Sequence, residues 1–434
     1  MQDIDLTGHW AGIASLIIFG VAYLLVIFED VIHMRKSKPV VLAAGVIWAL
    51  IGVAFAMAGQ PEVAHERALQ VIEEYGELLL FLIVAITYVN TLEERRAFEV
   101  LRGWLVGRGL FYRQLFLLTG ILSFFLSSVL DNLTTALVMG AVVMALGRDN
   151  PRFVAIACVS VVVAANAGGA FSPFGDITTL MVWQKGKLGF FEFFDLFLPS
   201  LVNWLVPALI MVWAVPVAKP AANVDHVTGK PGMWGVVVLF ALTIATAVGF
   251  KNFLNLPPAL GMMLGLGYLQ MLSYALQLRG TRRQDEDMIL DSFQQVQRVE
   301  WDTLFFFFGI IFAVGGLGVL GYLALASQVL YVGLGPDAAN IIIGVLSAVV
   351  DNIPLMFAVL TMDPAMSDGQ WLLITLTCGV GGSMLSIGSA AGVALMGQAR
   401  GFYGFASHLK WTPVVALGYG ASIVVHYWVN AALF

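Results

Sequence analysis

Three aspartates stand out because each lies within a long apolar stretch that contains no Lys or Arg. They are Asp131, Asp176 and Asp351. A carboxylate at membrane depth is expensive and marks a functional site by default. With no basic partner nearby in the sequence, it lowers that cost by binding a proton or a metal cation. The choice between a proton and a metal cation is the chemistry that proton-coupled cation exchange requires.

The side chains expected around these aspartates are hard oxygen donors, with no His or Cys thiolate among them. Oxygen ligands suit a hard cation such as Na⁺, whereas imidazole and thiolate suit transition metals. Each hydroxyl also has a structural alternative, because Ser and Thr often bond the preceding helical turn, and Asp176 could cap a helix. The candidates are Ser127, Asn132, Thr134, Thr135, Asn166, Ser172, Thr178, Thr179, Ser347, Asn352, Ser383, Ser386 and Ser389.

The composition requires that the elements carrying these residues lie in a membrane. Of the 434 residues, 59% are hydrophobic and 12% are charged. A soluble chain of this length could not bury so much apolar surface. A soluble enzyme, a nucleic-acid binder and a disordered chain are therefore excluded, and the net charge of −6 offers nucleic acid no basic face. No nucleophile–base pair or metal motif is present, so neither an enzyme nor a bound cofactor is expected.

Most of the apolar segments have the length of one membrane-crossing helix. Four others fit a single crossing poorly. We interpret 114–147 and 338–361 as re-entrant hairpins, and 153–183 and 371–399 as membrane helices that are broken midway. The expected single crossings are 12–28, 40–58, 78–92, 197–217, 233–250, 257–275, 303–324 and 411–432.

The basic residues set the orientation. If residue 1 lies outside, all but four of the 22 Lys and Arg fall in inside loops, a strong positive-inside bias. The longest polar segment, near 276–302, is predicted to be a solvated cytoplasmic linker between two halves. The cluster E-E-R-R at 93–96 is predicted to be a solvated helix end with local ion pairs. The four outside residues are Arg67, Lys185, Lys187 and Lys251.

The two halves of the chain repeat each other. L-S-S-V-L-D-N at 126–132 matches L-S-A-V-V-D-N at 346–352, and a downstream pattern of three glycines recurs at equal spacing. The orientation makes the two hairpins enter from opposite sides, so the repeats are inverted. Inverted repeats with discontinuous helices are typical of secondary transporters, whose site lies near the midplane. The predicted fold class is an all-α polytopic membrane protein with inverted repeats, two opposed re-entrant helical hairpins and two broken transmembrane helices.

This reading divides the chain into four parts. They are N-terminal scaffold helices at 1–72, a first repeat at 73–217, connecting helices with the central cytoplasmic loop at 218–299, and a second repeat at 300–434.

Four longer motifs resemble the NhaD family of Na⁺/H⁺ antiporters, relatives of the divalent-anion/Na⁺ symporters. They are S-S-V-L-D-N-L-T-T, N-A-G-G-A-F-S-P-F-G-D-I-T-T, V-E-W-D-T-L and G-G-S-M-L-S-I-G-S-A-A-G. The resemblance covers residues from about 73 to the C-terminus. It implies a scaffold that dimerises, a transport domain that holds the hairpins and broken helices, and elevator-type alternating access.

Carried over position by position, the resemblance implies two half-sites for the cation. The anion-transporting relatives have Ser-Asn-Thr at their hairpin tips, whereas this chain has Asp131-Asn132-Leu133 and Asp351-Asn352-Ile353, which argues against a dicarboxylate substrate. The half-sites are unequal, because the second has no acid at the position of Asp176. The implied ligands are Ser127, Asp131, Asn132, Asn166, Asp176, Thr178 and Thr179 in the first, and Ser347, Asp351, Asn352, Ser386 and Ser389 in the second.

The V-E-W-D-T element contributes Asp302 and Thr303, which we expect to cap the span that begins there. Asp302 has the alternatives of lining a cytoplasmic funnel or sensing pH.

These observations predict an Na⁺(Li⁺)/H⁺ antiporter in the inner (cytoplasmic) membrane of a bacterium. It would span the lipid bilayer many times, form a homodimer and export Na⁺ in exchange for protons that compete for Asp131, Asp351 and Asp176. It would need no cofactor beyond the transported ions. Two alternatives stay open. One is a Na⁺-coupled anion, dicarboxylate or oxyanion transporter of the same superfamily, and the other is a cation channel lined by Asp131 and Asp351.

Overall fold

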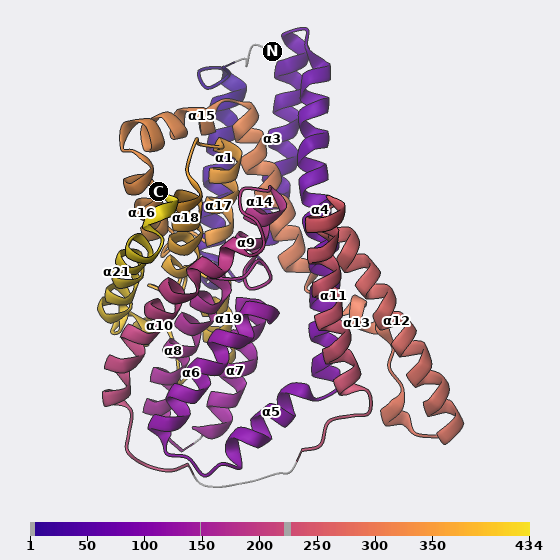
Figure 1. Cartoon of the computed structure of the whole chain (residues 1–434). Coiled ribbons are helices and arrows are strands. Elements are labelled where there is room, and N and C mark those ends of the chain that lie inside the picture. The colour runs from indigo at the N-terminus through magenta and orange to yellow at the C-terminus, as the bar shows by residue number, and fades with distance from the viewer. Residues whose placement is uncertain (1–4, 148, 221–226) are drawn as a thin grey trace.

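The protein is a bundle of helices (Figure 1). The computed structural model describes residues 5–147, 149–220 and 227–434, and no strand occurs within them. In these residues nine helices are long and apolar enough to cross a membrane, which confirms a polytopic membrane protein. Each expected single crossing coincides with a helix: α1 (Trp10–Ile27), α3 (Ser37–Met57), α4 (Pro61–Glu94), α10 (Phe197–Met211), α11 (Met233–Leu254), α12 (Pro258–Arg283), α14 (Trp301–Val319) and α21 (Thr412–Val429).

The four apolar ranges that fit one crossing poorly each contain two helices. The first pair meets at the single residue Asp131. The pairs are α6 (Tyr112–Leu130) with α7 (Asn132–Leu146), α8 (Pro151–Ala170) with α9 (Ile177–Gln184), α16 (Pro336–Leu346) with α17 (Asn352–Met362), and α18 (Asp368–Gly381) with α19 (Ala390–Gln398).

A polar side chain starts the second helix of each pair. The free backbone N–H groups of a first helical turn need acceptors, and a carboxylate or hydroxyl at the N-cap supplies one. The cap predicted for Asp176 is confirmed, since its carboxylate accepts from the Thr178 N–H. The four caps are Asp131, Asp176, Asp351 and Ser389.

The repeated glycines let backbone pass close to backbone where the second and fourth helix pairs are interrupted. A Cβ placed on Gly169 would lie 2.6 Å from the carbonyl oxygen of Gly175. A Cβ on Gly382 would lie 2.7 Å from the carbonyl oxygen of Gly388. Only glycine fits either position, so the matched spacing in the sequence reflects the same local backbone geometry in both halves.

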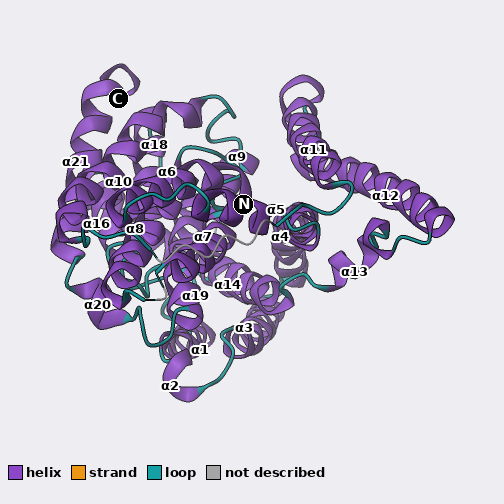
Figure 2. Cartoon of the chain, turned by 90° about the horizontal axis from the view of Figure 1, so that it is seen from below, coloured by secondary structure: helices purple, strands orange, loops and turns teal. Residues whose placement is uncertain are grey.

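The helices form two bodies that meet along one interface. The central body comprises α6–α10 and α16–α21, and it packs around α8, which is 94% buried along its apolar window. The flanking body comprises α1, α3, α4, α11, α12 and α14. Figures 1 and 2 show α11 and α12 standing to one side against α4. The bodies touch along α14 and α17, and the helix α5 (Ala97–Val106) leads from α4 toward the central body.

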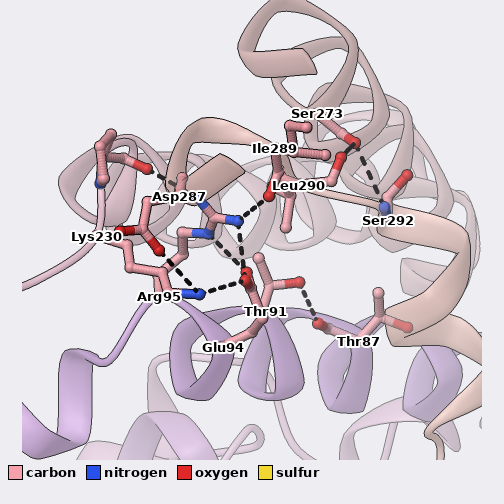
Figure 3. Close-up of polar contacts among 11 residues, drawn as sticks. Thr87, Thr91, Glu94, Arg95, Lys230, Ser273, Asp287, Ile289, Leu290 and Ser292 are labelled. Carbon is pink, nitrogen blue, oxygen red and sulfur yellow. Dashed lines mark hydrogen bonds and ion pairs between the residues drawn. The ribbon is translucent and has the colours of Figure 1, made fainter. Parts of the chain in front are cut away.

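A buried arginine anchors the linkers that are predicted to be cytoplasmic. The prediction of a helix end with local ion pairs at 93–96 holds, and Glu93 and Arg96 are exposed, but Arg95 is not solvated. Arg95 is 0% exposed. Its guanidinium donates to the carbonyl oxygens of Pro231 at 3.1 Å, Asp287 at 2.8 Å and Ile289 at 2.5 Å, and it pairs with Glu94 (Figure 3). Burial of this charge is tolerated because its N–H donors find acceptors.

The segment near 276–302 is therefore not simply a solvated loop. Its first part continues α12 to Arg283, and α13 (Ser292–Gln297) lies within it. Ser273 of α12 donates to the Leu290 carbonyl oxygen at 2.6 Å and accepts from the Ser292 N–H at 3.3 Å (Figure 3). These bonds fold the linker back onto the flanking body.

Candidate functional site

A cavity of about 390 Å³ separates the two bodies along part of their interface. Its walls come from α4 on one side and from α7 and α9 on the other, with α14 and α17 contributing. One end is lined by Asp131, Asn132, Asp176 and Asn352. The other end reaches loops that the basic-residue distribution assigns to the inside. There the charged lining residues are Glu93, Glu99, Arg102 and Glu300.

Asp176 is the point on which both helix-pair tips converge. Its Oδ2 accepts from Asn132 Nδ2 at 3.0 Å and from Asn352 Nδ2 at 2.9 Å. Its Oδ1 accepts from the Thr178 N–H at 3.2 Å. Asp176 is only 3% exposed. Residues from both halves of the sequence therefore meet at one carboxylate. The sequence analysis did not predict this convergence.

Asn166 connects the two interrupted helix pairs. Its Nδ2 donates to the Ser389 hydroxyl oxygen at 3.1 Å and to the Val162 carbonyl oxygen at 3.0 Å. Its Oδ1 accepts from Asn132 Nδ2 at 3.2 Å. This amide therefore holds the acid-bearing break of the first half against the serine-bearing break of the second.

The other two aspartates accept hydrogen bonds from the first turns of the helices that they cap. Asp131 accepts from the Thr134 N–H and from the Thr134 hydroxyl, each at 2.8 Å, with φ at +77°. A positive φ on a non-glycine residue is uncommon and is found at functional sites. Asp351 accepts from the Ile353 N–H at 3.4 Å, and its own N–H donates to the Tyr23 hydroxyl at 3.2 Å.

Several predicted hydroxyl ligands already make structural bonds. Ser127 donates to the Ala165 carbonyl oxygen at 2.6 Å, and Ser347 donates to the Cys378 carbonyl oxygen at 2.8 Å. Thr179 donates to the Asp176 carbonyl oxygen at 2.7 Å. In contrast, the buried hydroxyls of Thr178 and Ser386 have no hydrogen-bond partner among the described residues. These two oxygens keep their full capacity to bind a cation or a proton donor.

The charge at the site is not neutralised locally. No ion pair joins Asp131, Asp176 or Asp351 to a Lys or Arg within the part of the chain that the structure describes. Over the same residues, no three His, Cys, Asp or Glu side chains gather as a metal-binding group. The arrangement therefore presents carboxylates singly, among neutral oxygens.

The V-E-W-D-T element places one side chain at the interface between the two bodies and another within the flanking body. Thr303 lines the cavity and donates to the Glu300 carboxylate at 3.1 Å. Asp302 instead accepts from the Ser37 hydroxyl at 2.5 Å. Neither side chain makes the expected cap, since the N-cap of α14 is Glu300, without a side-chain bond. Tyr23 and Glu300 were missed. Tyr23 carries no signal in the sequence, whereas Glu300 lies within the recognised V-E-W-D-T motif.

Comparison with known proteins defines the class of transporter to which this fold and site belong. The family model described as "Citrate transporter" matches residues 23–379. The protein named Na⁺/H⁺ antiporter NhaD from Vibrio cholerae serotype O1 is 53% identical over all of this chain and 95% of its own length. Its namesake from Alkalimonas amylolytica is 54% identical over 99% of this chain and 93% of its own length. Sodium/proton antiporter 1 of Arabidopsis thaliana is 33% identical over 95% of this chain and 72% of its own length.

The chain therefore belongs to the membrane-transporter family of the matching model and to the NhaD family of Na⁺/H⁺ antiporters, as its motifs predicted.

Proposed function

We propose that the protein is a secondary active antiporter that exports Na⁺ or Li⁺ in exchange for protons across a bacterial cytoplasmic membrane. Relatives that are more than half identical are named Na⁺/H⁺ antiporters. The observation that carries the proposal is the nearly buried Asp176, bound by Asn132 and Asn352 but by no described Lys or Arg. Two neutral amides orient this carboxylate without cancelling its charge, so a mobile cation or proton must do so.

Exchange follows from competition for the same oxygens. When Asn132 and Asn352 donate through Nδ2 to Asp176, their Oδ1 atoms stay available as cation ligands. The unpartnered hydroxyls of Thr178 and Ser386 add further hard oxygens. Asp131 and Asp351 complete the proposed set of acids. A proton that binds a carboxylate removes the negative charge that holds Na⁺, so protonation on one side of the membrane releases the cation there.

Alternating access is proposed to follow from inverted repeats. Each half contains an arm, a helix pair with an acid at its tip, and an interrupted helix pair. The arms are α5 in the first half and α15 (Tyr322–Ser327) with the π-helix η4 (Gln328–Gly333) in the second. The predicted orientation makes the two tip-bearing helix pairs enter from opposite sides of the membrane, and their tips meet at Asp176. The central body would then move as a unit against the flanking body, in an elevator-type cycle.

The flanking body also offers a surface for the proposed homodimer. Helices α11 and α12 carry large exposed apolar side chains, including Trp234, Phe253 and Met271. In a membrane, lipid or a second subunit would cover them.

A Na⁺-coupled anion transporter is the second candidate, because the matching family model is described as "Citrate transporter". The site geometry does not favour it. A dicarboxylate would have to approach the three aspartates, whose charges no described basic residue pairs with. Like charges at short range disfavour binding strongly in a low-dielectric site. Uptake of radiolabelled citrate into proteoliposomes, dependent on Na⁺, would overturn the antiporter proposal.

The decisive test is Asp131→Asn assayed in everted membrane vesicles. We expect wild-type protein to dissipate a respiration-driven pH gradient on addition of Na⁺ or Li⁺, and Asp131→Asn to lose this response, because an amide binds neither ion competitively. Glu66→Gln, on the exposed start of α4, is the control and should behave as wild type. Full Na⁺-dependent dequenching by Asp131→Asn would refute the mechanism.

A further inference from the structure

Two lysines from the predicted outside loops join the central body to the flanking body. Lys185, which directly follows α9 of the central body, forms an ion pair with Glu74 of α4 in the flanking body, and both side chains are 33% exposed. Lys251, in the last turn of α11, donates to the Gln184 carbonyl oxygen at 3.3 Å. Both contacts therefore cross the interface between the two bodies, and both hold the same end of α9.

The helix they hold is the one that carries the central carboxylate. Asp176 caps the N-terminus of α9, and Gln184 is its last residue. A helix of this length spans about 12 Å, so the lysine contacts and Asp176 lie at opposite ends of one short rigid element. The C-terminal end of a helix carries partial negative charge, which favours the Lys251 ammonium group there.

The interface is joined at this end and open at the other. The cavity that reaches Asp176 leads toward Glu93, Glu99 and Glu300, in or next to loops predicted to lie inside. The lysine contacts lie beyond Asp176, toward the side predicted to be outside. A separate cavity of about 430 Å³ lies at the lysine end and is lined by Glu74, Gln184 and Lys185, but none of the three aspartates lines it. The structure therefore has the geometry of a cytoplasm-open transporter, because the cavity that contains Asp131 and Asp176 leads toward the inside loops.

We propose that the Lys185–Glu74 ion pair and the Lys251–Gln184 contact form an outer latch that stabilises the cytoplasm-open conformation. This inference rests on the proposed alternating-access function and adds the side chains that set its equilibrium. Sliding of the central body would carry Lys185 away from Glu74 and break both contacts. A partly exposed ion pair shifts a two-state equilibrium by about two- to fivefold, enough to tune transport without blocking it.

The test measures how often the cavity faces the cytoplasm. Ala141 lines the cavity, so Ala141→Cys gives a reporter, and the chain's own Cys158 and Cys378 are each 0% exposed. In everted vesicles, a membrane-impermeant maleimide should label the reporter more slowly when Lys185→Gln or Glu74→Gln is added, by at most the two- to fivefold change in the equilibrium. The exchanged pair Lys185→Glu with Glu74→Lys should restore the parental rate.

The matched control lies two residues away. Lys187 pairs with Asp363 at 2.5 Å, and both residues move with the central body. Lys187→Gln removes the same charge without crossing the interface, so it should leave the labelling rate unchanged. Parental labelling of Lys185→Gln, or equal slowing by Lys187→Gln, would refute the latch.

Exchange activity of the reporter protein, measured in the same vesicles, separates the two proposals. If the reporter exchanges Na⁺ for protons but Lys185→Gln does not change its labelling rate, only the latch proposal is wrong. If wild-type protein, assayed in the same vesicles, shows no such exchange, the proposed function is wrong whatever the labelling shows.

Discussion

At the scale of single residues, the site is organised around one oxygen atom. Asn132 and Asn352 come from different halves of the chain, yet both donate to Oδ2 of Asp176. Neutral donors fix the position of this carboxylate while leaving its charge in place. A lysine or arginine at either position would satisfy the same oxygen but would also remove the need for a mobile cation.

We predict that Asn132→Ala and Asn352→Ala each raise the apparent KM for Na⁺. A hydrogen bond to a charged group contributes about 1.5–3 kcal/mol, so the expected increase is roughly tenfold or more. The double variant should show a less than additive effect, because both amides act on the same oxygen. Na⁺ titration of the pH-gradient response in proteoliposomes measures this. Strictly additive effects would show that the two amides act independently of each other, which contradicts a shared role at one oxygen.

At the scale of elements, the interrupted helix pairs depend on close backbone approach. In both halves a glycine packs against the carbonyl of a second glycine across the break, at Gly169 and at Gly382. The same arrangement occurs where the caps differ, since one break carries Asp176 and the other Ser389. The two halves thus share the backbone geometry of the break, whereas only the first half has an acidic residue at the cap.

We expect Gly169→Ala and Gly382→Ala to abolish exchange or prevent folding, because each new methyl group would meet backbone at 2.6–2.7 Å. Gly267→Ala in α12 is the control, with nothing within 4 Å of the added Cβ. Alanine is the better helix former by about 1 kcal/mol, so this control should be neutral or slightly stabilising. Thermal denaturation of purified protein together with exchange assays would detect the contrast, and wild-type behaviour of both test variants would contradict it.

At the scale of the whole molecule, the proposed function needs two bodies that move while their connections hold. Arg95 lies at one such connection, where the end of α4 contacts the linkers that run before α11 and after α12 (Figure 3). Lys230 strengthens it by pairing with Glu94 at 3.3 Å. These contacts fix the end of α4 that is predicted to face the cytoplasm, from which α5 leads to the central body.

We predict that Arg95→Met lowers the stability of the protein markedly, because it leaves three carbonyl oxygens without their donor and Glu94 with Lys230 as its remaining partner. Breaking a buried ion pair costs about 3–5 kcal/mol, and the partial exposure of Glu94, 19%, places the expected loss at the lower end. Arg96→Gln is the control, since Arg96 is 48% exposed and 3.9 Å from Glu99. Melting temperatures in detergent should fall for Arg95→Met only; equal melting of both variants would contradict the anchoring role.

Much of this protein could be predicted from the sequence, because lipid imposes strict rules on a chain. Apolar length located the eight single crossings, and four ranges of unsuitable length proved to contain paired helices. Family motifs identified the NhaD relationship. Acids without basic neighbours in the sequence marked Asp131, Asp176 and Asp351 as candidates, because burial of charge in lipid is costly wherever it occurs.

The tertiary structure decided which of these groups meet. Sequence spacing made the two hairpin acids look equivalent, but packing of the two halves made Asp176 the shared acceptor and left Asp131 bound to its own helix turn. Packing also buried Arg95 in a segment predicted to be solvated, and it brought Lys185 to Glu74 across more than a hundred residues. Contacts between residues distant in the chain depend on how helices are arranged in three dimensions, and local patterns carry no record of that arrangement.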